Sequence, residues 1–147
     1  MVALNRLTRK KLGELLIEQG LLTEKQVQDT LRMQHQSGKL FGECVVENKL
    51  ITEDKMVAVL VAQFGIPFFK PSNYKIPQDL LEIFEPAMMR RYQFVPVDTI
   101  GSVLVIAIAG LLSEDIFKEI ETQTGCSLQL YLTRISEINN VLTSRGL

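Results

Sequence analysis

The sequence predicts an α+β protein in which tandem helical hairpins, four short helices in all, precede a small α/β subdomain. Apolar residues recur at helical spacing up to about residue 64. From residue 93 onward, segments rich in β-branched residues alternate with helical ones. Between these regions, residues 65–73 contain one glycine and two prolines, which interrupt helices. We therefore predict a helical tandem-repeat subdomain over residues 1–68 and an α/β subdomain over residues 69–147.

Threonines mark the predicted starts of two helices in the first half. Thr23 and Thr52 each precede acidic residues, and such residues are favoured in the first turn of a helix. Apolar side chains follow at spacings of three and four residues, as in Leu12, Leu15 and Leu16. The first half is therefore expected to form four helices.

The second half alternates between strand and helix patterns. The predicted strands cover residues 93–97, 102–108 and 127–132, with a turn over residues 98–101 between the first two. The predicted helices cover residues 78–84, 87–92, 113–123 and 136–142. Pro86 is expected to separate the first two of these helices, and Gly125 to end the third.

Composition excludes several classes of protein. The chain has 147 residues, of which 46% are hydrophobic and 22% charged, and its formal net charge is −1. These values indicate a folded domain without the basic surface that DNA or RNA binding requires. No apolar run approaches the ~20 residues of a membrane helix, and the N-terminal residues lack the pattern of a signal peptide. We expect a cytoplasmic protein in which Cys44 and Cys126 are reduced and buried.

An internal repeat is the most informative feature of the sequence. Residues 11–34 align with residues 40–63 at an offset of 29, with eight identities in 24 positions. The identical pairs are Gly13 with Gly42, Glu14 with Glu43, Glu18 with Glu47, Leu21 with Leu50, Thr23 with Thr52, Glu24 with Glu53, Leu31 with Leu60 and Gln34 with Gln63. The chain thus contains two helical hairpins of one design.

Two interpretations of this repeat are open. In the first, the repeated residues serve only as core, cap and turn positions of a duplicated hairpin. In the second, the paired glycines and glutamines serve a ligand. A glycine early in a helix costs about 1 kcal/mol relative to alanine, so Gly13 and Gly42 suggest a close approach to the backbone. Gln34 and Gln63, at the ends of the second helices, have no packing reason to recur.

The repeated pattern resembles a known family. It is similar to the cyclic di-GMP-binding N-terminal domain of type II secretion and type IV pilus assembly ATPases. The first copy matches at Leu12, Gly13, Leu16, Gly20, Val27, Leu31 and Gln34, and the second at Gly42, Val45, Met56, Leu60 and Gln63. The likeness continues over residues 63–68, in Arg90-Arg91-Tyr92 before Val95-Pro96-Val97, and at Gly125.

The resemblance implies that both hairpins hold a cyclic dinucleotide. Apolar side chains would contact the guanines, the two glycines would admit base or phosphate to the backbone, and the glutamines would bind a guanine edge or sugar. A cation at the first motif position would stack on guanine and offset the phosphates. The implied ligand-binding residues are Lys11, Leu12, Gly13, Leu16, Val27, Leu31, Gln34, Phe41, Gly42, Met56, Leu60 and Gln63.

Several residues depart from the family pattern. Lys11 keeps the charge but lacks the planar fork of arginine, and Leu40 has no charge where the second copy expects arginine. Lys49 replaces a turn glycine, so we expect Asn48 to take the left-handed conformation. Gly110 stands where the family has an acid after its strand. These departures are expected to weaken nucleotide binding.

Enzymatic motifs are missing from the sequence. It has no GxxxxGK[ST] loop, nucleophile elbow, HExxH or GxGxxG pattern, so we expect no catalytic residue. His35 is expected in an exposed linker without a metal, and no cofactor is expected. Arg90 and Arg91 are expected to form an exposed basic pair at a subdomain or partner surface.

Two functions follow. The first is a regulatory domain that binds cyclic di-GMP and acts with an ATPase domain in cis or in trans. The second is an adaptor that has lost nucleotide binding and docks an inner-membrane secretion or pilus assembly protein, which would place the chain at the periphery of that membrane.

Overall fold

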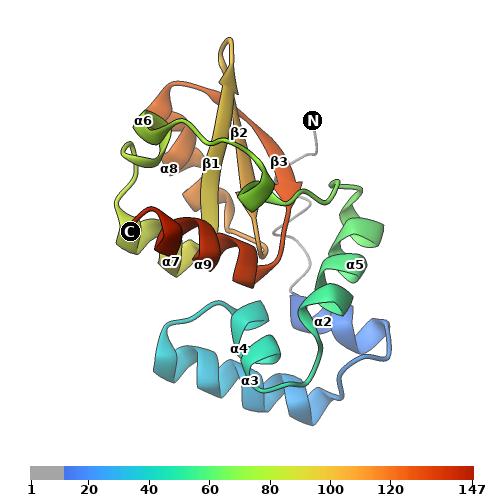
Figure 1. The fold of residues 1–147 in the computed structure, drawn as a ribbon. Coiled ribbons are helices and arrows are strands. Elements are labelled where there is room, and N and C mark those ends of the chain that lie inside the picture. The colour runs from blue at the N-terminus through green and yellow to red at the C-terminus, as the bar shows by residue number, and fades with distance from the viewer. Residues whose placement is uncertain (1–11) are drawn as a thin grey trace.

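The fold combines a group of helices with a small mixed sheet (Figure 1). The computed structural model describes residues 12–147, and this part of the chain contains eight α-helices and three strands. In chain order the elements are α2 (Leu12–Glu18), α3 (Glu24–Ser37), α4 (Phe41–Glu47), α5 (Glu53–Phe64), the 3-10 helix η1 (Pro71–Asn73), α6 (Gln78–Leu81), α7 (Pro86–Tyr92), β1 (Phe94–Ile100), β2 (Val103–Ile108), α8 (Glu114–Thr124), β3 (Ser127–Leu132) and α9 (Ile135–Ser144). The predicted α+β class is confirmed.

The predicted threonine caps begin the second helix of each hairpin. Thr23 Oγ1 accepts a hydrogen bond from Gln26 N at 3.2 Å, and Gln26 Oε1 accepts one from Thr23 N at 2.9 Å, so the two residues form a capping box. Thr52 Oγ1 accepts a hydrogen bond from Lys55 N at 3.2 Å. These bonds satisfy backbone donors that the first turn of a helix leaves unpaired.

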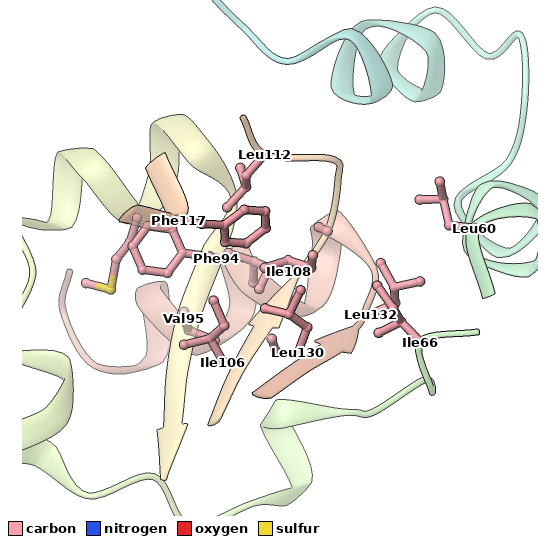
Figure 2. Packing of buried hydrophobic residues seen from close by; sticks show 14 of the residues in the cluster. Leu60, Ile66, Phe94, Val95, Ile106, Ile108, Leu112, Phe117, Leu130 and Leu132 are labelled. Carbon is pink, nitrogen blue, oxygen red and sulfur yellow. The ribbon is translucent and has the colours of Figure 1, made fainter. Parts of the chain in front are cut away.

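The two hairpins are packed differently despite their common design. Helices α2, α3 and α4 contact one another, whereas α5 contacts β3 (Figure 1). Ile66, which follows α5, is buried and lies beside Leu132 of β3 (Figure 2). Helices α2, α3 and α4 therefore form one group, whereas α5 packs against the sheet.

The sheet has the order β1-β2-β3. Strands β1 and β2 form an antiparallel hairpin, and β3 runs parallel to β2 after the crossover through α8. Ser113 Oγ accepts a hydrogen bond from Ile116 N at 3.4 Å at the start of α8, and Gly125 ends that helix in the left-handed conformation. In Figure 1, α9 crosses in front of the strands and α8 passes behind them. Buried side chains between these layers include Phe94, Ile108 and Phe117 (Figure 2).

Several boundaries in the second half differ from the prediction: α6 already ends at Leu81, and α9 extends from Ile135 to Ser144, beyond both of its predicted ends. Strand β1 includes Asp98, Thr99 and Ile100, because it continues to pair with β2 beyond a bulge between Pro96 and Asp98. The turn therefore contains only Gly101 and Ser102. Pro86 begins α7 instead of separating two helices. Proline suits this first position because its fixed φ matches the helix and its missing N–H has no partner there anyway.

Two details of the first half also differ. Lys49 takes the left-handed conformation with φ of 58°, whereas Asn48 has φ of −85° and donates from Nδ2 to the Cys44 carbonyl at 2.7 Å. His35 lies in the last turn of α3, because the helix continues to Ser37 before Gly38 ends it. Residues 38–40 therefore connect α3 to α4, instead of the residues 35–39 that separate the two copies of the repeat in the sequence.

The join between the two halves runs beside β3. Phe69 N donates to the Leu132 carbonyl, and Leu132 N donates to the Pro67 carbonyl, both at 2.9 Å. The domain boundary at residues 68 and 69 stays a prediction. Both cysteines are free thiols, Cys44 buried and Cys126 partly exposed. Over residues 12–147, every helix is too short or too polar to span a bilayer.

Candidate functional site

A cavity of about 690 Å³ lies between the first three described helices and one edge of the sheet. Its helical wall consists of Leu12, Gly13, Glu14, Ile17, Glu24, Val27, Gln28, Leu31, Gln34, Leu40, Phe41, Gly42 and Glu43. Its other wall consists of Gln93, the segment from Ala109 to Ser113, and Ile135. The volume lies within the range of small-molecule sites, and a mainly apolar lining with a few polar groups is typical of them.

The topology of the sheet explains the second wall. Because β2 and β3 are parallel and β1 is antiparallel to β2, the start of β1 and the ends of β2 and β3 meet at one edge. The segments that flank these strand ends supply Gln93, residues 109–113 and Ile135. Ligands of open α/β sheets commonly bind outside the carboxyl ends of parallel strands.

Seven of the twelve predicted site residues line this cavity. They are Leu12, Gly13, Val27, Leu31, Gln34, Phe41 and Gly42. Leu16, Met56 and Leu60 are buried in the core outside the cavity, and Gln63 is exposed outside it. Lys11 lies outside the described residues. The structure thus brings the first motif together with the start of the second, and the ligand roles themselves stay predictions.

The paired glycines have different neighbours. A Cβ at Gly13 would lie 2.8 Å from Val27 Cγ1 and 3.3 Å from Phe41 Cζ, so α2 needs glycine there to pack against α3 and α4. A Cβ at Gly42 would meet only Leu12 Cδ2 at 3.6 Å, an ordinary contact. Helix packing alone therefore accounts for Gly13 but not for Gly42, and both backbones border the cavity.

The charged residues that line the cavity within the described chain are all acidic. They are Glu14, Glu24 and Glu43, and no described lysine or arginine lines it. Glu43 is only 9% exposed, and this burial raises the pKa of its carboxyl group above the ordinary value, against a hydrogen bond from Leu40 N that lowers it. A dianionic ligand would therefore meet carboxylates, with Lys11 as the nearest predicted cation in the sequence.

Two departures from the family pattern face each other in the structure. A Cβ at Gly110 would lie 3.5 Å from Leu40 Cδ1, so the segment after β2 touches the residue that begins α4. The sequence places Leu40 where arginine is expected and Gly110 where an acid is expected. Both residues line the cavity, and neither brings the charge that the family pattern has at its position.

Gln93 is a cavity residue that the sequence did not predict. It has φ of 53° and ψ of 59° after the last turn of α7, and its side chain is 3% exposed. Its Nε2 donates to the Arg90 carbonyl at 2.7 Å, and its own carbonyl accepts from Ala109 N at 3.0 Å. Its Oε1 has no hydrogen-bond partner within the described chain. The sequence pattern gave no signal for this role, because it placed Gln93 at the start of the predicted strand over residues 93–97.

The two residues of the predicted basic pair, Arg90 and Arg91, have different surroundings in the structure. Arg90 is partly buried and donates to the Leu147 carbonyl, which ties α7 to the end of the chain. Arg91 is exposed and stacks over the ring of Tyr92 at 5.5 Å from its centroid. The expectation of an exposed pair is wrong for Arg90, because its guanidinium is held by hydrogen bonds to the Leu147 carbonyl and to Thr143 Oγ1. Within residues 12–147, His, Cys, Asp and Glu form no group of three suited to a metal.

The comparisons with known proteins agree with this fold. The family model of the MshEN domain matches residues 64–145, which is more than half of the chain. The type IV pilus assembly ATPase PilB of Myxococcus xanthus is 26% identical over 97 residues, covering 66% of this chain and 17% of that protein. PilB of Thermus thermophilus is 25% identical over 126 residues, covering 84% of this chain and 14% of that protein. The chain therefore spans about a sixth of the length of these relatives.

Two solved structures share the fold. A structure of MshE with cdg has a TM-score of 0.65 at 19% identity, with 92% of this chain and 98% of that one covered. A structure of the N-terminal domain of XpsE has a TM-score of 0.69 at 19% identity, with 97% and 95% covered. The family match and these structures confirm the resemblance that the repeated motif indicated. This chain belongs to the MshEN domain family.

Proposed function

We propose that this chain is a regulatory domain of a type II secretion or type IV pilus ATPase system and that it binds cyclic di-GMP in the cavity. The observation that carries the proposal is the convergence of seven predicted site residues, from both repeats, on one cavity of about 690 Å³. The structure of MshE with cdg, which shares the fold, supports the choice of ligand. The regulated ATPase domain acts in cis or in trans.

The lining suits a flat, partly apolar ligand. Leu12, Val27, Leu31 and Phe41 offer apolar contacts to the faces of the bases. The amide of Gln34 supplies both a donor and an acceptor for a base edge or a sugar. Leu31 is 42% exposed, so it stands at the mouth, where a ligand would cover it. Lys11 is the proposed partner of the phosphates.

Titration calorimetry with cyclic di-GMP tests this proposal. We expect micromolar binding by the wild type and a loss of at least tenfold in Leu31→Glu, because a carboxylate at the mouth repels the ligand. Ile100→Glu is the matched control, since Ile100 is 69% exposed and lies at the end of β1, outside the cavity. The absence of heat from the wild type at high protein concentration would overturn the proposal.

The repeat provides a second matched pair. Gln34 lines the cavity, whereas its equivalent Gln63 is exposed elsewhere. We expect Gln34→Ala to weaken binding about tenfold, through the loss of hydrogen bonds, and Gln63→Ala to leave it unchanged. Equal losses in the two variants would instead support a site that uses both motifs in full.

The second candidate function is the adaptor, and the charge of the cavity favours it. Glu14, Glu24 and Glu43 line the cavity without a described basic residue, which suits a cationic or neutral protein segment better than a dianion. This adaptor would dock the cytoplasmic part of an inner-membrane secretion or pilus assembly protein. If the chain is an adaptor, we expect no heat with cyclic di-GMP and saturable binding of that purified cytoplasmic part. Leu31→Glu should change the affinity of this binding, and Ile100→Glu should leave it unchanged.

A further inference from the structure

The sheet-edge wall of the cavity holds one buried polar side chain whose hydrogen bonding is incomplete. Gln93 is 3% exposed, lines the cavity, and has an Oε1 atom without a partner in the described chain. A buried carbonyl oxygen without a hydrogen bond is less stable than a satisfied one, because it has lost its contact with water and gained no partner. The oxygen is itself covered by its neighbours, so a ligand donor reaches it only when the side chains over it shift on binding.

The rest of Gln93 is fixed in place. Its Nε2 donates to the Arg90 carbonyl at 2.7 Å, which fixes the orientation of the amide and leaves Oε1 as the atom without a hydrogen bond. Its carbonyl accepts from Ala109 N at 3.0 Å, which joins it to the cavity segment after β2. Its positive φ of 53° is rare for a residue other than glycine. Backbone strain of this kind tends to persist at functional sites, where the surroundings impose it.

We infer that Gln93 is a specificity-determining residue of the cavity and that its Oε1 accepts an N–H from the base of a bound nucleotide. The inference rests on the proposed binding of cyclic di-GMP. The Watson–Crick edge of guanine carries N–H donors at N1 and at the 2-amino group. Adenine presents an acceptor at N1 and has no 2-amino group. Adenine has its Watson–Crick N–H donor only at the 6-amino group, where guanine has the O6 acceptor, so an acceptor that faces the N1 and 2-amino positions selects guanine over adenine.

The energetic reason is the asymmetry of hydrogen bonding in a buried site. A ligand that donates to Gln93 relieves an unsatisfied oxygen, whereas a ligand that presents an acceptor leaves it unsatisfied and adds repulsion. Sites built around such a bond reject analogues that lack the donor. The apolar side chains of the helical wall cannot supply this discrimination, because they contact base faces, which guanine and adenine share.

Calorimetric titration of wild type and Gln93→Met with cyclic di-GMP and cyclic di-AMP tests the inference. Methionine keeps the length and volume of the side chain but removes the acceptor. We expect the wild type to prefer cyclic di-GMP, and Gln93→Met to bind it about tenfold more weakly and to lose most of the preference. Gln123→Met is the matched control, because Gln123 also donates through Nε2 to a backbone carbonyl, that of Ile83 at 2.8 Å, away from the cavity.

A second variant distinguishes the loss of the acceptor from misfolding of the protein. Gln93→Gly removes the same acceptor, and glycine adopts a positive φ without strain, so this variant retains the backbone at residue 93. It should show the same loss of preference for guanine, with a melting temperature close to that of the wild type.

The outcomes separate the two proposals. Binding by the wild type with unchanged affinity and preference in both Gln93 variants would overturn the role of Gln93 and leave the proposed function standing. The absence of binding by the wild type would overturn both. An equal loss in Gln123→Met would assign the effect to stability and contradict the inference.

Discussion

Gly13 and Gly42 occupy equivalent positions of the repeat, but a side chain would meet different surroundings at each. The Cβ of an alanine at residue 13 would lie 2.8 Å from Val27 Cγ1, and valine in a helix cannot rotate away easily. At residue 42 the nearest atom would be Leu12 Cδ2 at 3.6 Å. The same residue type thus serves close helix packing at one site and borders the cavity with room to spare at the other.

This difference predicts opposite effects of one substitution. Gly13→Ala should destabilise the protein by about 1–3 kcal/mol, because the new methyl group overpacks the contact between α2 and α3. Gly42→Ala should be neutral or stabilising by up to ~1 kcal/mol, because alanine is the better helix former. Urea denaturation of both variants measures these effects. Equal destabilisation would show that Gly42 is also a packing position.

Glu43 gives a pH-dependent prediction. Burial raises the pKa of its carboxyl group above its ordinary value of 4.5, so the folded protein holds this proton more tightly than the unfolded chain does. The stability from protonated Glu43 is therefore complete below pH 4.5 and is lost as the pH rises through the higher pKa of the folded state. Glu43→Gln keeps an oxygen for Leu40 N and should be more stable than wild type at pH 7, with the difference vanishing below pH 4.5.

Thermal unfolding across that pH range measures the effect. Glu14→Gln is the matched control, because Glu14 is the repeat equivalent and its side chain is exposed. A difference between Glu43→Gln and wild type that stays constant with pH would contradict the assignment to this carboxyl group.

The sequence could predict the residues of the cavity that belong to the repeat, and it missed the others for a physical reason. Gly13, Leu31 and Gln34 are visible because the repeat contains each of them twice. Gln93 and Ile135 come to the cavity only through the pairing of β1 and β3 with β2, which no local pattern specifies. Met56 and Leu60 match the motif as well as their equivalents do, but α5 packs against β3 and takes them away from the cavity.

At the scale of elements, the local sequence is sufficient to predict a helix or a strand where a cap residue or a hydrophobic periodicity determines it. Thr23, Thr52 and Ser113 begin helices as predicted, because each hydroxyl group accepts a backbone N–H. The third strand was predicted with its observed bounds over residues 127–132. The turn after β1 was misplaced because the bulge near Asp98 depends on the partner strand. Pro86 was read as an interruption although proline also favours the first position of a helix.

The end of α4 gives a prediction of its own. Lys49 has φ of 58°, whereas its repeat equivalent Gly20 has φ of 70°, so a lysine occupies a position that favours glycine. Lys49→Gly should stabilise the protein by about 1 kcal/mol, because an L side chain in the left-handed region costs about that much. The converse, Gly20→Lys, should be destabilising by a similar amount. Chemical denaturation measures both, and a loss of stability in Lys49→Gly would show that the lysine side chain makes a compensating contact.

At the scale of the whole molecule, polar contacts connect α5 of the second hairpin to the α/β half. Glu53 in the first turn of α5 accepts hydrogen bonds from Ser136 N at 2.8 Å and from Ser136 Oγ at 2.9 Å, at the start of α9. Arg134 pairs with Asp54, and its guanidinium lies 5.2 Å from the centroid of the Phe68 ring. The first hairpin instead faces the α/β half across the cavity. A ligand there would bridge the two parts.

This link can be tested through the repeat. Glu53→Ala should cost about 1–2 kcal/mol, because two hydrogen bonds to Ser136 are lost, and Glu24→Ala at the equivalent position should cost only a few tenths. The effects of Glu53→Ala and Ser136→Ala should not add, since the two residues share one contact. Strict additivity in a double-mutant cycle followed by thermal unfolding would show that the contact does not join the halves.

The central claim is that a cyclic dinucleotide binds between helices α2 to α4 and the sheet edge, and amide NMR shifts test it most directly. Gly13, Gly42 and Gly110 border the cavity, whereas Gly65 and Gly125 do not. Adding cyclic di-GMP to the ¹⁵N-labelled protein should shift the amide signals of the first three glycines and leave the other two in place. Unchanged signals at Gly13, Gly42 and Gly110 under saturating ligand, or shifts confined to Gly65 and Gly125, would contradict the claim.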